Sequence, residues 1–197
     1  MRLGGDRRCR KQISVPSAKM ARALFLDRDG VINHDYGYVH RQEDFDLVPG
    51  IFELCLKAID AGYLLIVVTN QAGIAKGIFE EADFYSISDH MKMLFQAEGI
   101  SFADIYYSPF HKDATISKFR AEHITRKPHP GLFFEAALDH NISLQDSVVI
   151  GDNLTDLQAG KAAGIRRLFL HETTGCLSYS DSSFVAKDSL SAFAAML

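Results

Sequence analysis

The sequence predicts an α/β fold, a Rossmann-like parallel sheet with helices on both faces. Two features of the chain carry this prediction. Short apolar runs alternate with longer segments in which apolar residues recur at helical spacing. Several of these runs are followed by polar residues, as expected where parallel strands end at a ligand-binding edge. The 197 residues and the 47% hydrophobic content are enough for one globular core.

The strands are predicted from the apolar runs. Residues 64–68 read LLIVV, a continuous β-branched run that is typical of a strand buried on both faces. Helical segments separate the runs, so the strands are expected to pair in parallel. The other strand candidates are shorter and lie at residues 23–26, 105–107, 148–150, 167–170 and 184–185.

The helices are predicted from the spacing of apolar residues. Residues 50–60 place Ile51, Leu54 and Ala58 on one face and stop before Gly62. The remaining helix candidates are residues 80–98, 131–140, 154–163 and 189–196.

The first 20 residues differ in composition from the rest of the chain. They carry six basic residues and one acid, a net charge of +5, so the total of −4 leaves −9 on the remainder. We expect a disordered tail or a misplaced start before Met20, with an organelle-import peptide as a third reading. A secretory signal is disfavoured because no apolar run follows the arginines. Residues 21–197 are expected to form a single domain.

Composition disfavours several classes of function. An acidic body is unsuited to binding nucleic acid. No apolar stretch approaches the roughly 18 residues of a membrane helix. The three cysteines, Cys9, Cys55 and Cys176, are too far apart in sequence for a CxxC site and odd in number. We therefore expect a cytoplasmic protein, monomeric, with no membrane or nucleic-acid partner.

Polar side chains follow the predicted strands where they would meet at one edge of the sheet. Asp27 and Asp29 follow the first strand, Thr69 the second and Asp152 the fourth. Lys127 precedes a helix, and Asp156 lies one helical turn beyond Asp152. Taken singly, these residues could be turn or helix-cap residues. Their order along the chain favours a site.

The chemistry of this set points to phosphoryl transfer. Clustered carboxylates repel one another unless a cation lies among them, and oxygen-only ligation favours Mg²⁺ over zinc. One carboxylate can act as a nucleophile, and a second can protonate a leaving oxygen and later activate water. A hydroxyl and a lysine suit the oxygens of the transferring phosphoryl group.

Four motifs in this order resemble those of the haloacid dehalogenase (HAD) superfamily of aspartate-nucleophile phosphatases. They are FLDRDGVIN at residues 25–33, VVTNQ at 67–71, RKP at 126–128 and VIGDNLTD at 149–156, and the resemblance covers about residues 21–172. Longer matches indicate a branch that contains heptose-bisphosphate phosphatases and histidinol phosphatases. These matches are DYGYV at 35–39, TNQAGIAKG at 69–77 and RKPHPG at 126–131.

The resemblance implies a role for each motif residue. Asp27 would be the nucleophile and a Mg²⁺ ligand, and Asp152 a further ligand. Asp29 would be the general acid and base, with its backbone carbonyl on the metal. Thr69 and Lys127 would hold the phosphoryl oxygens, while Asp156 would orient Lys127 or the metal shell. The implied substrate-binding residues are Asp35, Tyr36, Gly37, Tyr38, Asn70, Gln71, Ala72, Arg126 and Asn153, with Arg126 a candidate for a second phosphate.

The chain departs from this branch in one segment. The branch carries a zinc loop with Cys-x-His and Cys-x-Cys pairs, but no cysteine lies between Cys55 and Cys176 here. A tetrahedral zinc site needs four good ligands, so we predict that zinc is absent. His111, His123 and His129 are then expected to be loop or substrate-rim residues. The spacing of the motifs also leaves no room for a large cap domain.

The resemblance implies a Mg²⁺-dependent phosphomonoesterase that forms an aspartyl-phosphate. The expected reaction is removal of the 7-phosphate of D-glycero-D-manno-heptose 1,7-bisphosphate, a precursor step in lipopolysaccharide synthesis. The alternatives are a histidinol-phosphate phosphatase or another small-molecule phosphatase. A polynucleotide 3′-phosphatase and a non-catalytic phospho-ligand-binding domain are the remaining readings. The intact Asp27, Asp29, Lys127 and Asp152 disfavour loss of catalysis.

Overall fold

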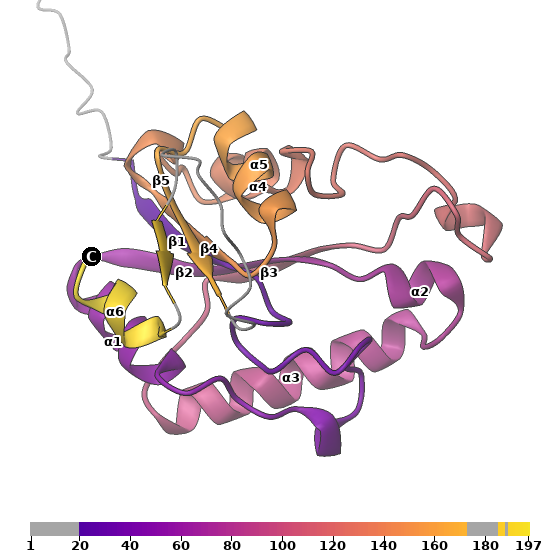
Figure 1. The fold of residues 1–197 in the computed structure, drawn as a ribbon, viewed down its shortest axis with the longest axis horizontal. Helices are drawn as coiled ribbons and strands as arrows, with labels where there is room; N and C mark the ends of the chain where they lie inside the picture. Colours follow the sequence, from indigo (N-terminus) through magenta and orange to yellow (C-terminus); the bar gives the residue numbers. More distant parts are fainter. Residues whose placement is uncertain (1–19, 173–184, 188) are drawn as a thin grey trace, which may run out of the picture.

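The computed structural model describes residues 20–172, 185–187 and 189–197. These residues form a six-stranded parallel sheet in the order β3-β2-β1-β4-β5-β6. Figure 1 shows the sheet between two layers of helices. The predicted α/β fold is therefore confirmed. The strands are β1 (Arg22–Leu26), β2 (Tyr63–Asn70), β3 (Asp104–Ser108), β4 (Val148–Gly151), β5 (Arg167–His171) and β6 (Val185–Lys187).

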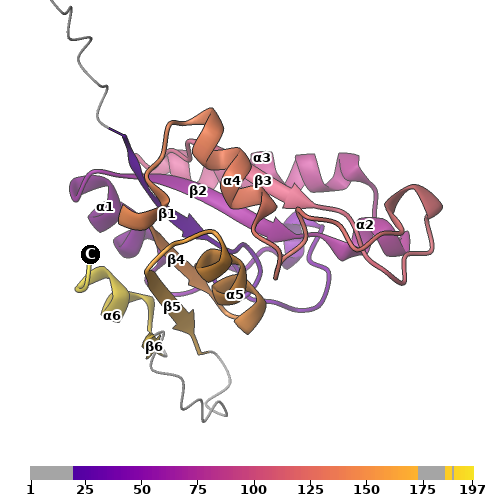
Figure 2. The same cartoon turned by 90° about the horizontal axis from the view of Figure 1, so that it is seen from above.

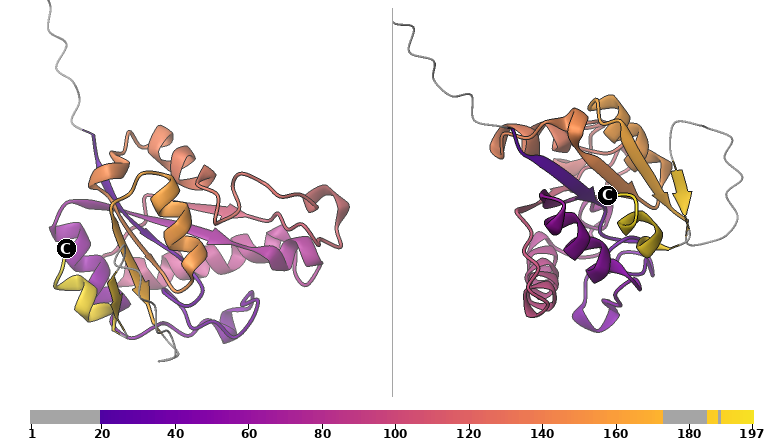
Figure 3. Two further views of the ribbon diagram at one scale, coloured as in Figure 1. Left: turned by 45° about the horizontal axis from the view of Figure 1, so that its top comes forward. Right: turned by 90° about the vertical axis from the view of Figure 1, so that its left-hand side faces the viewer.

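The helices cover both faces of the sheet, which Figure 3 shows most clearly in its end-on view. One layer contains α1 (Ile51–Asp60), α3 (Glu81–Ala97) and α6 (Leu190–Ala194). The opposite layer contains α4 (Gly131–Asp139) and α5 (Leu154–Ala162). The short helix α2 (Ala72–Lys76) follows β2 directly, and three 3-10 turns complete the described elements: η1 (Gln42–Asp44), η2 (Ser117–Phe119) and η3 (Leu144–Asp146).

The core is divided by the sheet, and the alternation of side chains along each strand makes the division. In β1, Leu24 and Leu26 face the layer of α1, α3 and α6. Ala23 and Phe25 face the layer of α4 and α5, where Phe25 packs edge-on against Phe133 with ring centroids 5.0 Å apart. Successive residues of a strand point to opposite faces, so a strand buried on both sides is apolar throughout.

The topology brings the functional motifs to one edge. The chain runs from β1 outward to β2 and β3, then returns to the other side of β1 with β4 and β5. Figure 2 shows β1 between β2 and β4 at the centre of the sheet. The connections therefore diverge at the carboxyl ends of β1 and β4, the place where open α/β sheets bind ligands.

Some element boundaries differ from the prediction. β2 runs two residues further and includes Thr69 and Asn70 at its end. α2 was not predicted, because its sequence AGIAK is too short to show a helical repeat. The predicted strand near residue 184 is β6, whose described part begins at Val185, and Phe184 lies outside the described residues. The basic tail through Lys19 also lies outside them.

The segments that join the strands contain no cap domain within the described residues. Between β1 and β2 the regular elements are η1 and α1, and no separate domain lies there or between β2 and β4. Among the described helices, none is long and apolar enough to cross a membrane.

Candidate active site

The loop after β1 brings the first acidic motif beside β4. The Asp27 backbone N–H donates a hydrogen bond to the Ile150 carbonyl of β4 at 3.0 Å. Gly30 follows with a φ of 83°, and a Cβ there would lie 2.1 Å from Asp152 Oδ2. Glycine is required at this position both for the turn and for the close approach of the Asp152 carboxylate.

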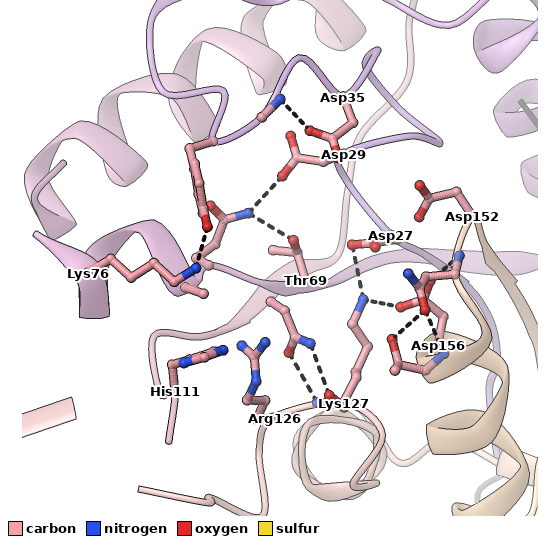
Figure 4. A pocket seen from close by; sticks show the side chains of 17 residues that line it. Asp27, Asp29, Asp35, Thr69, Lys76, His111, Arg126, Lys127, Asp152 and Asp156 are labelled. Atoms are coloured by element: carbon pink, nitrogen blue, oxygen red, sulfur yellow. Dashed lines mark hydrogen bonds and ion pairs between the residues drawn. The ribbon is translucent and has the colours of Figure 1, made fainter. Parts of the chain in front are cut away.

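Three carboxylates meet at this edge of the sheet (Figure 4). Asp27, Asp152 and Asp156 each place one oxygen within 4.8 Å of the other two. Burial and the charges of Asp156 and Asp29 raise the pKa of Asp27 to about 7, against the opposing effect of Lys127. Burial and the charges of Asp27 and Asp156 raise the pKa of Asp152 to about 8. The cluster therefore has an excess of negative charge that a cation would relieve.

Lys127 is the buried cation of the site. Its ammonium lies 3.0 Å from Asp27 Oδ1 and 2.6 Å from Asp156 Oδ1, and it donates to the Val68 carbonyl at 2.8 Å. Burial disfavours the charged form, but the ion pairs with Asp156 and Asp27 outweigh it and raise the pKa of Lys127. Asn70 holds the backbone of the same residue, because its amide pairs with both the N–H and the carbonyl of Lys127 at 3.1 Å.

Asp29 is held by a set of hydrogen-bond donors. The Arg28 guanidinium reaches both carboxylate oxygens at 2.8 Å, and Asn33 Nδ2 donates to Oδ1 at 3.0 Å. Gln71 Nε2 donates to Oδ2 at 3.1 Å and to Thr69 Oγ1 at 2.9 Å. Arg28 is itself only 1% exposed, and its contacts fix the Asp29 side chain in one orientation.

Helix α5 begins at the same site. The Asn153 side chain accepts a hydrogen bond from the Thr155 backbone N–H at 3.1 Å. Asp156 Oδ2 in turn accepts from the Asn153 backbone N–H at 3.0 Å, which completes a capping box. Gly151 precedes this turn, and a Cβ there would lie 2.3 Å from Asp156 Oδ2. The start of α5 thus fixes the carboxylate that pairs with Lys127.

A cavity of about 590 Å³ opens over these groups. Its far wall carries Lys76, His111 and Arg126, which Figure 4 shows opposite the carboxylates. Burial, together with the charges of Arg126 and Lys76, lowers the pKa of His111. Lys76 donates a hydrogen bond to the Tyr38 hydroxyl at 2.5 Å. Within the described residues neither Lys76 nor Arg126 forms an ion pair, so this wall presents unbalanced positive charge.

The structure brings the predicted site residues together with one exception. All of them line the cavity apart from Tyr36. Tyr36 is 63% exposed and donates a hydrogen bond to Asp46 at 2.9 Å, so its expected place in the pocket is corrected. The chain reverses at Gly37 and Tyr38, where φ is 83° and 58°, and this turn sends Tyr38 inward and Tyr36 outward.

Sequence reasoning missed three residues that shape the site. One is Lys76, which stands in a recognised motif but was given no role, whereas His111 was expected at the substrate rim and does line the cavity. Arg28 and Asn33 flank Asp29 within four residues, and their proximity in sequence is the signal that could have found them. An arginine between two aspartates is ordinarily expected to be solvated, which is why its burial was not predicted.

The carboxylates fit a hard divalent cation. Among the described residues, Asp27, Asp152 and Asp156 are the one group of three or more His, Cys, Asp or Glu side chains close enough to share an ion. All their donors are oxygens, which a hard divalent cation prefers. Burial is the first cause of the raised pKa values of Asp27 and Asp152, and the charges of the neighbouring carboxylates add to it. The absence of zinc elsewhere stays a prediction.

The fold and the site together define the class of phosphohydrolases that act through an aspartate. A family model described as HAD-hydrolase-like matches residues 124–175. The heptose-1,7-bisphosphate 7-phosphatase of Burkholderia mallei, named for the α-anomer, is 48% identical over 73% of this chain and 76% of its own length. That of Vibrio cholerae, named for the β-anomer, is 44% identical over 77% of this chain and 81% of its own.

A solved structure of a heptose-bisphosphate phosphatase also resembles this chain. The D,D-heptose 1,7-bisphosphate phosphatase of B. bronchiseptica, complexed with magnesium and phosphate, has a TM-score of 0.76. It is 26% identical, and the match covers 89% of this chain and 97% of that one. The chain belongs to the HAD-like hydrolases and, within them, to the family of the heptose-bisphosphate phosphatases.

Proposed function

We propose that this protein is a Mg²⁺-dependent phosphatase that removes the 7-phosphate of D-glycero-D-manno-heptose 1,7-bisphosphate. The observation that carries the proposal is that cationic side chains stand at both ends of the cavity. One end holds the buried Lys127 beside the Asp27 nucleophile, and the other holds Lys76 and Arg126, which form no ion pair among the described residues. A substrate with phosphates at both ends matches this arrangement. The names of the relatives support the same substrate.

In the proposed reaction Asp27 attacks the phosphorus of the 7-phosphate, and the bond between phosphorus and the sugar oxygen breaks. Asp29 gives a proton to that leaving oxygen. Water then attacks the aspartyl-phosphate, Asp29 takes its proton, and phosphate leaves while Asp27 is restored. Lys127 and Thr69 stabilise the oxygens of the transferring group. Arg28, Asn33 and Gln71 keep the Asp29 carboxylate in place between the two proton transfers.

Mg²⁺ would be held by the carboxylates of Asp27 and Asp152 and by the Asp29 backbone carbonyl. When bound, it supplies positive charge against the carboxylates and the phosphate oxygens. Asp156 is already engaged by Lys127 and by the Asn153 N–H, so its role is to orient the lysine. We further propose that residues 21–197 act as one domain, which the pairing of β6 with β5 and the packing of α6 on α1 support. The cytoplasm is the proposed location.

The experiment that tests this function measures phosphate release with Mg²⁺ from both anomers of heptose 1,7-bisphosphate and from histidinol phosphate. We expect kcat/KM to favour a bisphosphate by about a thousandfold or more, because the cationic wall repels the amine of histidinol phosphate. Phosphorus NMR of the product should show that the anomeric phosphate is retained. Lys76→Gln should raise KM for the bisphosphate and spare a simple monophosphate ester. A preference for histidinol phosphate would replace the proposal with that activity.

A further inference from the structure

The segment that carries Arg126 has little regular structure. Residues 109–130 join β3 to α4, and η2 is the one regular element that they contain. Figure 1 shows this segment extending past the sheet beside α2. Arg126, His111 and Lys127 all reach the cavity from it. In a segment of this kind, local packing and hydrogen bonds decide where a side chain lies.

Hydrogen bonds tie the end of this segment to β3 and α4. Thr125 Oγ1 lies 3.1 Å from Ser108 Oγ and 2.7 Å from His123 Nδ1. The Thr125 backbone N–H lies 3.3 Å from the same Nδ1, so the side chain and the backbone of Thr125 both hold that ring nitrogen. The neighbouring backbone packs closely on α4, since a Cβ at Gly131 would lie 2.5 Å from the Ile124 carbonyl oxygen.

His123, which Thr125 holds in place, packs against Phe110. Their rings stack with centroids 3.9 Å apart and 16° between the planes. Phe110 also meets the buried Phe119 edge-on, with centroids 5.9 Å apart. The Phe110 carbonyl accepts a hydrogen bond from Arg126 at 3.0 Å. The residue that stacks on His123 is therefore the residue that holds the guanidinium.

Space beside the stack would let Arg126 move if the stack were lost. A second cavity of about 390 Å³ lies there, and both His123 and Arg126 line it. His123 does not line the cavity over the carboxylates. The His123 ring therefore acts on that cavity only through its neighbours, and one of them is Phe110, whose carbonyl holds the Arg126 guanidinium. The His123 carbonyl also accepts a hydrogen bond from the Arg126 backbone N–H at 3.0 Å.

We propose that His123 is a positioning residue that sets the place of Arg126, and thereby the recognition of the substrate's second phosphate. Its ring fixes Phe110 by stacking, while its Nδ1 is fixed by Thr125. The Phe110 carbonyl then directs the guanidinium toward the cavity. This proposal rests on the function proposed above, because it needs a second phosphate for Arg126 to bind.

The test compares steady-state kinetics on heptose 1,7-bisphosphate and on p-nitrophenyl phosphate, which has one phosphate. His123→Ala should raise KM for the bisphosphate about tenfold, with kcat little changed and p-nitrophenyl phosphate turnover unaffected. His123→Phe keeps the stack and should recover part of the loss, and Thr125→Val should give a smaller increase in KM. In an Arg126→Ala background, His123→Ala should add nothing further, because both changes remove the same interaction.

Four outcomes would contradict the proposed function or the proposed role of His123. If Arg126→Ala leaves the KM for the bisphosphate unchanged, the proposed function fails at this subsite. If Arg126→Ala raises KM but neither His123→Ala nor Thr125→Val does, the positioning role is wrong. Equal losses of kcat on both substrates, or effects of His123→Ala and Arg126→Ala that add, would reduce His123 to a structural residue.

Discussion

At the scale of single residues, the site depends on how one buried ammonium is shared between two carboxylates. Lys127 contacts both Asp27 and Asp156, and its side chain is 2% exposed. Removing a partner from a buried charge is costly unless another partner remains. Asp156 would remain after a change at Asp27, so the nucleophile can be replaced without leaving the lysine unpaired.

Asp27→Asn should therefore abolish turnover and leave the fold intact. The change is nearly isosteric, but the amide cannot form an acyl phosphate. We expect kcat to fall by at least about a thousandfold. Phosphate release measures the activity, and thermal denaturation in the same buffer serves as the control for folding. Activity near that of the wild type would exclude the aspartyl-phosphate.

Arg28 gives a second prediction at this scale, because its side chain meets the catalytic carboxylates at Asp29. Arg28→Lys keeps the charge but loses the planar guanidinium, whose Nε and Nη2 together reach both carboxylate oxygens. We expect kcat to fall by about ten- to a hundredfold through misplacement of the general acid, with KM within about twofold of the wild type. A rise in KM without a change in kcat would show that Arg28 serves substrate binding instead.

At the scale of elements, sequence patterns predicted the strands and helices that pack against the core. The strands β1, β2, β4 and β5 are apolar runs, and α1 and α3 bury apolar residues at helical spacing, so these elements are visible in the sequence. Elements decided by backbone conformation were not visible. The turn at Gly37 and Tyr38 reverses the chain through two positive φ angles, and no residue pattern gave its direction. The misplacement of Tyr36 follows from that turn.

Asn153 caps the start of α5 and is also a candidate substrate-binding residue, and two variants can distinguish these roles. Asn153→Ala removes the acceptor for the Thr155 N–H and should cost about 1 kcal/mol of stability. Asn153→Ser can still cap the helix and should restore that stability. If Asn153 also binds the sugar, the serine variant will keep a raised KM for the bisphosphate. Denaturant unfolding and steady-state kinetics on both variants decide between the two roles.

At the scale of the whole molecule, the carboxylate cluster links stability to pH and to the metal. The folded protein raises the pKa of Asp27 to about 7 and that of Asp152 to about 8, from an ordinary value of 3.8. Between pH 3.8 and these raised pKa values, the folded state therefore binds more protons than the unfolded chain. The stability that these groups contribute is greatest below pH 3.8 and is lost as the pH rises through about 7 and 8.

Replacing one carboxylate isolates this contribution from every other titrating group in the protein. In metal-free protein, Asp152→Asn should raise the Tm above that of the wild type at pH 8, by at least about 3 °C, and much less at pH 5. The amide removes a charge that is buried beside Asp27 and Asp156, and at pH 5 that charge is already neutralised by a proton. Adding Mg²⁺ at pH 8 should raise the Tm of the wild type more than that of Asp152→Asn, since the ion and the substitution relieve the same repulsion. Parallel pH curves for the two metal-free proteins would mean that the three carboxylates do not oppose folding, and the charge imbalance that points to a cation here would lose its support.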